Sequence, residues 1–78
     1  MQDSPYECVL DIVRRVLRVD TLDVRKDFFD LAATSLSIMQ IVSLVKQECG
    51  APVSIMEAFD ACDIDSFARM AAERCGGR

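Results

Sequence analysis

The sequence predicts an all-α fold, a four-helix bundle with three longer helices, a short third helix and a long loop between the first two helices. Three observations support this: apolar residues recur at helical spacing, helix-start signals precede them, and 78 residues contain only two prolines and three glycines. An apolar fraction of 51% is enough for a packed core and argues against disorder. A chain of this length forms one domain, residues 1–78, with little material for a closed active-site pocket.

The first helix has a clear start signal. Ser4 can act as the N-cap, Pro5 occupies the first helical position, and Glu7 follows three residues after the cap. We expect the helix to cover residues 5–18 or 5–19. Its apolar stripe consists of Tyr6, Val9, Leu10, Val13, Val16 and Leu17. The three arginines near its end fall off this stripe and are interpreted as a solvated face.

Between residues 20 and 33 the helical signal fades. Four aspartates alternate with apolar residues here, which predicts a loop held against the core. A turn of helix is expected around residues 27–29. Phe28 and Phe29 are both interpreted as core anchors that hold the next helix start in position, without contacting a ligand themselves.

The second helix begins near Ser35 and should continue to Cys49, because residues 36–49 contain no glycine or proline and Gly50 follows. Its apolar stripe consists of Ile38, Ile41, Val42, Val45 and Cys49. Thr34 is the expected N-cap, with its hydroxyl accepting a bond from a backbone N–H of the first turn.

Ser35 therefore lies in the first turn of this helix. Unpaired backbone N–H groups and the helix dipole favour a phosphate at that position, so Ser35 is well placed to carry a phosphoester. The chain has no histidine that could act as its general base. We predict that another enzyme modifies Ser35 and that the residue is not catalytic.

Two more helices follow. Pro52 belongs to an extended connector, and Ser54 with Glu57 forms a capping box that opens a short helix ending at Asp60 or one residue earlier. Asp63 can cap the last helix. That helix has a stripe of Ile64, Phe67, Ala68 and Ala71, and Gly76 and Gly77 should end it.

Charge and hydropathy limit the partners. The net charge of −4 argues against nucleic acid, which basic patches bind. No apolar run approaches the roughly 18 residues of a membrane span, and the N-terminus does not look like a signal peptide. We expect a monomeric, cytoplasmic protein.

The four cysteines form no CxxC pair and have no histidine beside them, so no metal site is expected. In a secreted chain they could form two disulfides in three pairings. Without a signal peptide, free thiols are favoured. Cys8 and Cys49 would then be small apolar core residues, whereas Cys75, beside two glycines, should be an exposed thiol.

Residues 27–36, DFFDLAATSL, resemble the "FFDLGGDSL" motif of thiolation domains, the peptidyl and acyl carrier proteins of nonribosomal peptide and polyketide assembly lines. Residues 59–64, FDACDI, resemble the family's element between helices 3 and 4. The resemblance covers nearly the whole chain, with both motifs and all four helices in the family's order, and it implies the acyl carrier protein type of four-helix bundle.

The resemblance implies a swinging-arm carrier. A phosphopantetheinyl transferase would move 4'-phosphopantetheine from coenzyme A onto Ser35, with magnesium at the transferase. The thiol of the arm would hold an aminoacyl or acyl group as a thioester. Adenylating or acyl-loading enzymes and condensing or tailoring enzymes would be its partners, and the chain would have no catalytic activity of its own.

The chain departs from the family before the serine. Ala32 stands where the family has glycine, which predicts that this backbone does not need a positive φ. Thr34 replaces the usual aspartate, so it keeps the cap but leaves open which transferase recognises the chain. The missing carboxylate is also the one feature that favours an alternative, an unmodified interaction or regulatory module of the same fold.

One face of the second helix is the expected docking surface. Leu36 and Met39 point away from the apolar stripe and lie near Ser35, and Gln40 and Ser43 extend the same face. Glu48 is the only acid of this helix, whereas fatty-acid-type carriers have an acidic face there. This leans toward the peptidyl type, in nonribosomal peptide or hybrid peptide-polyketide biosynthesis. The identity of the cargo stays open, as does whether the chain is a free-standing carrier or an excised domain.

Overall fold

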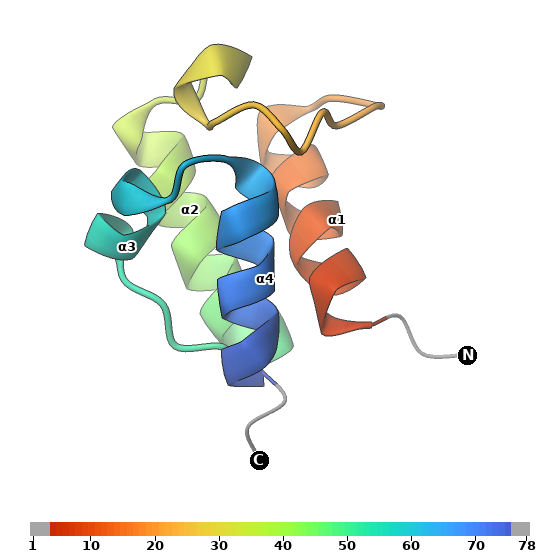
Figure 1. Ribbon diagram of the computed structural model, residues 1–78, viewed down its shortest axis with the longest axis vertical. Coiled ribbons are helices and arrows are strands. Elements are labelled where there is room, and N and C mark those ends of the chain that lie inside the picture. Colours follow the sequence, from red (N-terminus) through yellow and green to blue (C-terminus); the bar gives the residue numbers. More distant parts are fainter. Residues whose placement is uncertain (1–3, 76–78) are drawn as a thin grey trace.

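Three long helices pack side by side in the computed structural model, which describes residues 4–75 (Figure 1). The elements in chain order are α1 (Pro5–Leu17), the 3-10 turn η1 (Phe29–Leu31), α2 (Ser35–Leu44), the π-helical turn η2 (Val45–Cys49), α3 (Ile55–Asp60) and α4 (Ile64–Cys75). The short α3 lies beside α2, and the loop after α1 crosses one end of the bundle. The predicted all-α four-helix bundle is confirmed. No helix among the described residues is long and apolar enough to cross a membrane.

Helix α1 begins as predicted. The Ser4 hydroxyl accepts a hydrogen bond from the Glu7 backbone N–H at 3.2 Å, and Pro5 is the first helical residue. The helix ends at Leu17 because Arg18 adopts a left-handed conformation with φ 59° and donates its N–H to the Arg14 carbonyl. Ile12, outside the predicted stripe, is fully buried.

The core lies between α1, α2 and α4. Phe67 of α4 is its largest fully buried side chain and meets Phe28 edge-to-face, with ring centroids 5.3 Å apart and planes at 77°. The buried residues are Val9, Leu10, Ile12, Val13, Phe28, Ala33, Ile38, Ile41, Val45, Cys49, Ala51, Val53, Ala58, Ile64, Phe67, Ala68 and Ala71. The predicted stripe of α4 is therefore confirmed, and α2 with η2 buries its predicted stripe except for half-buried Val42.

The loop between α1 and α2 is held against the bundle, as predicted. The carbonyls of Val24 and Lys26 accept hydrogen bonds from the backbone N–H groups of Asp65 and Ile64, at 2.9 and 3.0 Å. These donors belong to the first turn of α4, which has no intrahelical partners for them. The loop carbonyls thus accept hydrogen bonds from otherwise unpaired N–H groups at the start of α4. Phe28, only 2% exposed, anchors the loop in the core.

The interpretation of Phe29 as a core anchor was wrong. Its side chain is 55% exposed and stacks on Phe59 of α3, with ring centroids 5.8 Å apart and an interplanar angle of 9°. Residues in a 3-10 turn project about 120° apart, so two successive phenylalanines cannot face the same core. Phe28 faces inward, and Phe29 consequently faces solvent.

The second helix changes its hydrogen-bonding pattern near its end. Residues 35–44 form a regular α-helix, and Val45–Cys49 form a π-helical turn. Gly50 then adopts a left-handed conformation with φ 70° and donates its N–H to the Val45 carbonyl. Gly50 thus ends the helix at the predicted residue.

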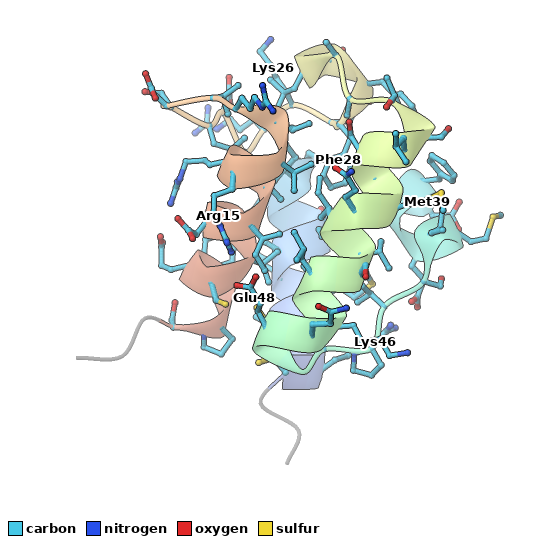
Figure 2. All side chains as sticks on the ribbon, turned by 180° about the vertical axis from the view of Figure 1, so that it is seen from behind. Arg15, Lys26, Phe28, Met39, Lys46 and Glu48 are labelled. Atoms are coloured by element: carbon cyan, nitrogen blue, oxygen red, sulfur yellow. The ribbon has the colours of Figure 1, made fainter. Side chains whose placement is uncertain are left out.

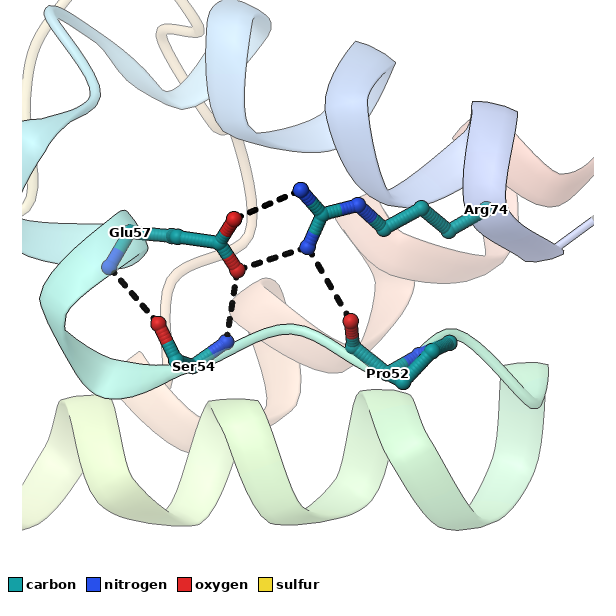
Figure 3. A network of polar contacts seen from close by, with 4 residues as sticks. All are labelled: Pro52, Ser54, Glu57 and Arg74. Atoms are coloured by element: carbon teal, nitrogen blue, oxygen red, sulfur yellow. Dashed lines mark hydrogen bonds and ion pairs between the residues drawn. The ribbon is translucent and has the colours of Figure 1, made fainter.

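Helix α3 is fastened to α4 by a polar network (Figure 3). Ser54 and Glu57 form the predicted capping box, with bonds of 3.1 and 3.0 Å. The Arg74 guanidinium donates to both carboxylate oxygens of Glu57 at 2.6 Å and to the Pro52 carbonyl at 3.0 Å. The bonds from Arg74, with those from Ser54, lower the pKa of Glu57 to about 2. Of the six residues of α3, Ala58 is buried, and the network adds a polar link to α4 beside the packing of α3 on α2.

Arg15 joins α1 to the end of the second helix. In Figure 2 it points toward Glu48 of η2, and its guanidinium lies 2.7 Å from the carboxylate of that residue. Asp11, one turn earlier on α1, lies 3.3 Å from the same guanidinium. All three side chains are substantially exposed, so the interaction adds little to stability. It agrees with the predicted solvated face of α1.

All four cysteines are free. Cys49 is buried and Cys8 is half-buried, which fits their predicted role as small core residues, and Cys62 is exposed. Cys75 was expected to be exposed, but it is half-buried and its thiol hydrogen-bonds the Cys49 carbonyl. That prediction was wrong because α4 remains helical through Cys75 and turns the thiol toward η2. Gly76 and Gly77, predicted to end the helix, lie outside the described residues.

Candidate functional site

Ser35 is the first residue of α2, and its side chain is exposed. Thr34 caps the helix as predicted: its backbone is extended, and its hydroxyl accepts a hydrogen bond from the Ser37 N–H at 3.2 Å. The Thr34 carbonyl accepts the N–H of Ile38 at 3.0 Å, which starts the helical ladder. Ser35 thus has a fixed backbone and an accessible hydroxyl.

The approach to Ser35 is set by η1. Ala33 is buried and donates its N–H to the Phe28 carbonyl at 3.0 Å, while Ala32 donates to the Phe29 carbonyl at 3.0 Å. Ala32 has φ 65°, which corrects the expectation that alanine here indicates an ordinary backbone. The 3-10 turn must be closed by a left-handed residue before the chain can enter α2, and this geometry persists although the residue carries a methyl group.

The electrostatics at Ser35 suit a phosphate. Backbone N–H groups of the first helical turn lack intrahelical acceptors, and the N-terminal end of the dipole is positive. The first turn of α2 contains no acidic residue that would repel a phosphate. Among residues 4–75, no group of three or more His, Cys, Asp or Glu side chains is placed to hold a metal ion. An exposed hydroxyl at this helix start is therefore in a favourable environment for a phosphoester.

Large apolar side chains are exposed around this serine. We call the five of them the apolar face: Phe29, Leu36, Met39, Met56 and Phe59, which are between 38% and 66% exposed. Within residues 4–75, these exposed large hydrophobics come from η1, α2 and α3 alone, the elements that lie beside the start of α2 (Figure 1). A concentration of apolar surface in one region is typical of a docking site.

The four residues predicted to bind partners lie together on α2. Leu36, Met39, Gln40 and Ser43 line a shallow groove. Leu44 and Gln47 complete it. Met39 projects from the outer side of α2 in Figure 2, away from the core.

Sequence reasoning missed the contribution of η1 and α3 to the apolar face. Met56 and Phe59 are three residues apart on α3, so they share one side of that helix, and Ala58 occupies the buried side. The spacing of these two residues in the sequence could have predicted an exposed apolar side of α3. Phe29 offered no such signal, because its exposure depends on which of two adjacent phenylalanines faces the core.

The fold and the site together define a class of protein: a small helical domain that presents an exposed serine at a helix start. Residues 7–71 match the family described as "Phosphopantetheine attachment site", and the chain belongs to this family. The resemblance to thiolation domains is thereby confirmed. Domains of this family carry 4'-phosphopantetheine as a covalent group.

The chain is also similar to surfactin synthase subunit 1 of Bacillus subtilis (strain 168), with 31% identity over 64 residues. The similarity covers 82% of this chain but 2% of that protein, so the chain spans about one-fiftieth of the length of this relative. No solved structure matches the chain.

Proposed function

We propose that this chain is a peptidyl-type carrier domain of nonribosomal peptide or hybrid peptide-polyketide biosynthesis. Ser35 carries 4'-phosphopantetheine donated by coenzyme A, and the arm holds aminoacyl or acyl intermediates as thioesters. The observation that carries this proposal is the exposed Ser35 at the start of α2, inside the segment that matches the attachment-site family. The similarity to a surfactin synthase subunit supports the peptidyl type.

The residues around Ser35 support the arm without performing chemistry. Thr34 fixes the start of α2, so that the Ser35 hydroxyl has a defined position for a phosphopantetheinyl transferase. The N–H groups of the first turn favour the resulting phosphodiester electrostatically. The sequence has no histidine to activate the hydroxyl, which supports a carrier without catalytic activity of its own. The thiol of the bound arm supplies the thioester chemistry.

The apolar face is the proposed contact surface for the transferase, for adenylating or acyl-loading enzymes and for condensing or tailoring enzymes. Leu36 and Met39 lie nearest to Ser35 in sequence and are 63% and 49% exposed. Burying such side chains in a partner favours association by roughly 1.5–3 kcal/mol each. We propose that residues 1–78 act as one monomeric carrier domain. A cytoplasmic location would give access to coenzyme A and suits the four free thiols.

The alternative is an unmodified interaction module of the same fold. It is favoured by Thr34, which lacks the carboxylate usual before the serine. A thioester test separates the two functions. The chain is incubated with magnesium, a broad-specificity transferase and an aminoacyl-coenzyme A, and its intact mass is measured before and after hydroxylamine treatment.

A carrier gains the mass of one aminoacyl-phosphopantetheine. Hydroxylamine then removes the aminoacyl group alone, because it cleaves thioesters and leaves the phosphodiester intact. A chain that gains no mass with several transferases is the unmodified module. A mass gain that hydroxylamine does not change would contradict the thioester.

A further inference from the structure

We propose that Cys8 and Cys49 are an oxidisable thiol pair that closes reversibly to a disulfide and fastens α1 to the end of the second helix. The two sulfurs are 2.6 Å apart although the residues are separated by 41 positions in the sequence. Cys8 lies in the first turns of α1, and Cys49 is the last residue of η2. This inference goes beyond the carrier function and does not involve Ser35.

The geometry selects this pair among the four cysteines. Cys75 also lies nearby, but its thiol contacts the backbone carbonyl of Cys49, whereas the Cys8 thiol contacts the Cys49 sulfur itself. Cys62 is exposed in the turn between α3 and α4 and has no thiol contact among the described residues. The ends of α1, η2 and α4 therefore meet around one residue, Cys49, and only Cys8 contacts its sulfur.

The oxidant we name is a small disulfide such as glutathione disulfide. The Cys8 thiolate attacks it, forms a mixed disulfide and releases one glutathione thiolate. The sulfur of Cys49 then attacks the Cys8 sulfur, its proton passes to the solvent, and the second glutathione leaves. Two thiols are oxidised to one protein disulfide, and one glutathione disulfide is reduced to two glutathiones.

Accessibility sets the order of these two steps. Cys8 is half-buried, whereas Cys49 is 9% exposed, so Cys8 meets the oxidant first. Burial, with the neighbouring Cys8 thiol as the next cause, raises the pKa of Cys49 to about 12. Cys49 is therefore not the first nucleophile. After Cys8 has formed the mixed disulfide, Cys49 loses its proton to the solvent, and its thiolate attacks the adjacent Cys8 sulfur as the resolving partner.

The disulfide would affect stability and leave the attachment site in place. It would close a loop containing most of α1, the connecting segment and the second helix, which restricts the unfolded chain. Ser35 lies at the other end of the second helix, about 20 Å from Cys49 at the rise of a helix. We therefore expect a rise in Tm on the order of 10 °C on oxidation.

The test uses the full chain carrying Ser35→Ala, so that no arm thiol enters the count and the result is independent of the proposed function. The protein is equilibrated with defined ratios of glutathione and glutathione disulfide, quenched with acid, denatured and alkylated. Intact mass counts the remaining thiols, and peptide mapping identifies any cross-link. Oxidised protein should accept two alkyl groups instead of four, and the linked peptides should contain Cys8 and Cys49.

Single Cys→Ser variants identify which cysteines form the disulfide. Cys8→Ser should abolish the disulfide and the rise in Tm, whereas Cys62→Ser and Cys75→Ser should retain both. Four alkylations at every ratio, mixed disulfides that never resolve, or a cross-link that includes Cys62 or Cys75 would overturn the proposal. If Cys8→Ser fails to fold, peptide mapping of the parent chain decides the pairing by itself.

Discussion

Ala32 adopts a backbone conformation that L-residues with a side chain disfavour, at the point where η1 ends and the chain turns toward Ser35. Gly50 has nearly the same conformation at the end of η2, with φ 70° against 65° for Ala32. A methyl group added at Gly50 would meet no atom within 4 Å, so any cost of adding it is conformational. The two positions therefore form a natural pair for an experiment.

We predict that Ala32→Gly stabilises the domain and that Gly50→Ala destabilises it. The left-handed conformation costs a non-glycine residue about 1 kcal/mol, partly offset by the greater freedom of glycine in the unfolded chain. The expected changes in the free energy of unfolding are about +0.5 kcal/mol for Ala32→Gly and about −0.5 kcal/mol for Gly50→Ala. Urea unfolding measures both, and a loss of stability in Ala32→Gly would contradict the assigned backbone.

Thr34 gives a second prediction at the scale of single residues. Thr34→Ala removes the acceptor of the Ser37 N–H and should cost about 1 kcal/mol of stability. Thr34→Asp keeps an acceptor and places a negative charge at the positive end of the helix dipole, so it should be tolerated. Unfolding of both variants is compared with that of the wild type. An Asp variant less stable than the Ala variant would contradict the assignment of residue 34 as the N-cap of α2.

Capping was predictable from sequence because it is local chemistry. Ser4, Thr34, Ser54 and Asp63 each accept a hydrogen bond from a backbone N–H three residues later, as the sequence predicted. The donor and the acceptor lie within one helical turn, so no knowledge of the packing is needed.

Orientation toward other elements was harder to predict. Phe29 faces away from the core and Cys75 faces η2, and both outcomes depend on how a turn sits against a neighbouring helix. The conformation of Ala32 was also missed, because residue identity alone signals a positive φ only when glycine is present. The position of Ser35 at a helix start follows from the local cap alone and does not depend on packing.

At the scale of elements, the attachment of α3 to α4 should depend on pH. Glu57 has a pKa of about 2 in the folded domain, against an ordinary value of 4.5. A carboxyl group whose pKa is lowered by folding stabilises the fold above its unfolded pKa, and this contribution disappears as the pH falls through the folded pKa. The window is therefore from about pH 5 to about pH 2.

We predict that Glu57→Gln and Arg74→Met each lessen the loss of stability across this window. The double variant should lose no more of the pH dependence than Glu57→Gln alone, because Glu57→Gln already removes the titrating group, whereas Arg74→Met leaves the bonds from Ser54 to Glu57. Asp63, whose pKa is lowered by the Ser66 backbone N–H, contributes in the same direction and will remain. Urea midpoints measured from pH 7 to pH 2.5 provide the test. Unchanged pH dependence in Glu57→Gln would contradict the role assigned to the pair.

The apolar face leads to a prediction about docking. Binding of the loaded carrier to an adenylating or condensing partner should weaken markedly in Leu36→Ala and Met39→Ala, by about tenfold each for a loss near 1.4 kcal/mol. Raising the salt concentration should change the affinity only modestly, because screening acts on exposed charges and not on apolar contacts. Lys46→Ala, on an exposed residue of η2, is the control and should leave the affinity nearly unchanged. A steep salt dependence, with both apolar substitutions silent, would assign docking to the acidic loop between α1 and α2.

At the scale of the whole molecule, the two chemically distinctive sites lie at opposite ends of one helix. Ser35 opens α2, and Cys49 closes η2 beside Cys8 and Cys75. The apolar face surrounds the first of these ends, and the thiols lie at the second. The bundle between them separates the exposed serine at the start of α2 from the thiols at the end of η2.

The attachment of 4'-phosphopantetheine to Ser35 is the central claim, and intact mass spectrometry tests it most directly. The chain is incubated with coenzyme A, magnesium and a broad-specificity transferase, beside two variants of serines in the same helical turn. Wild type and Ser37→Ala should each gain one phosphopantetheine, and Ser35→Ala should gain none. A modified Ser35→Ala chain, or a wild-type chain that stays unmodified with several transferases, would contradict the assignment.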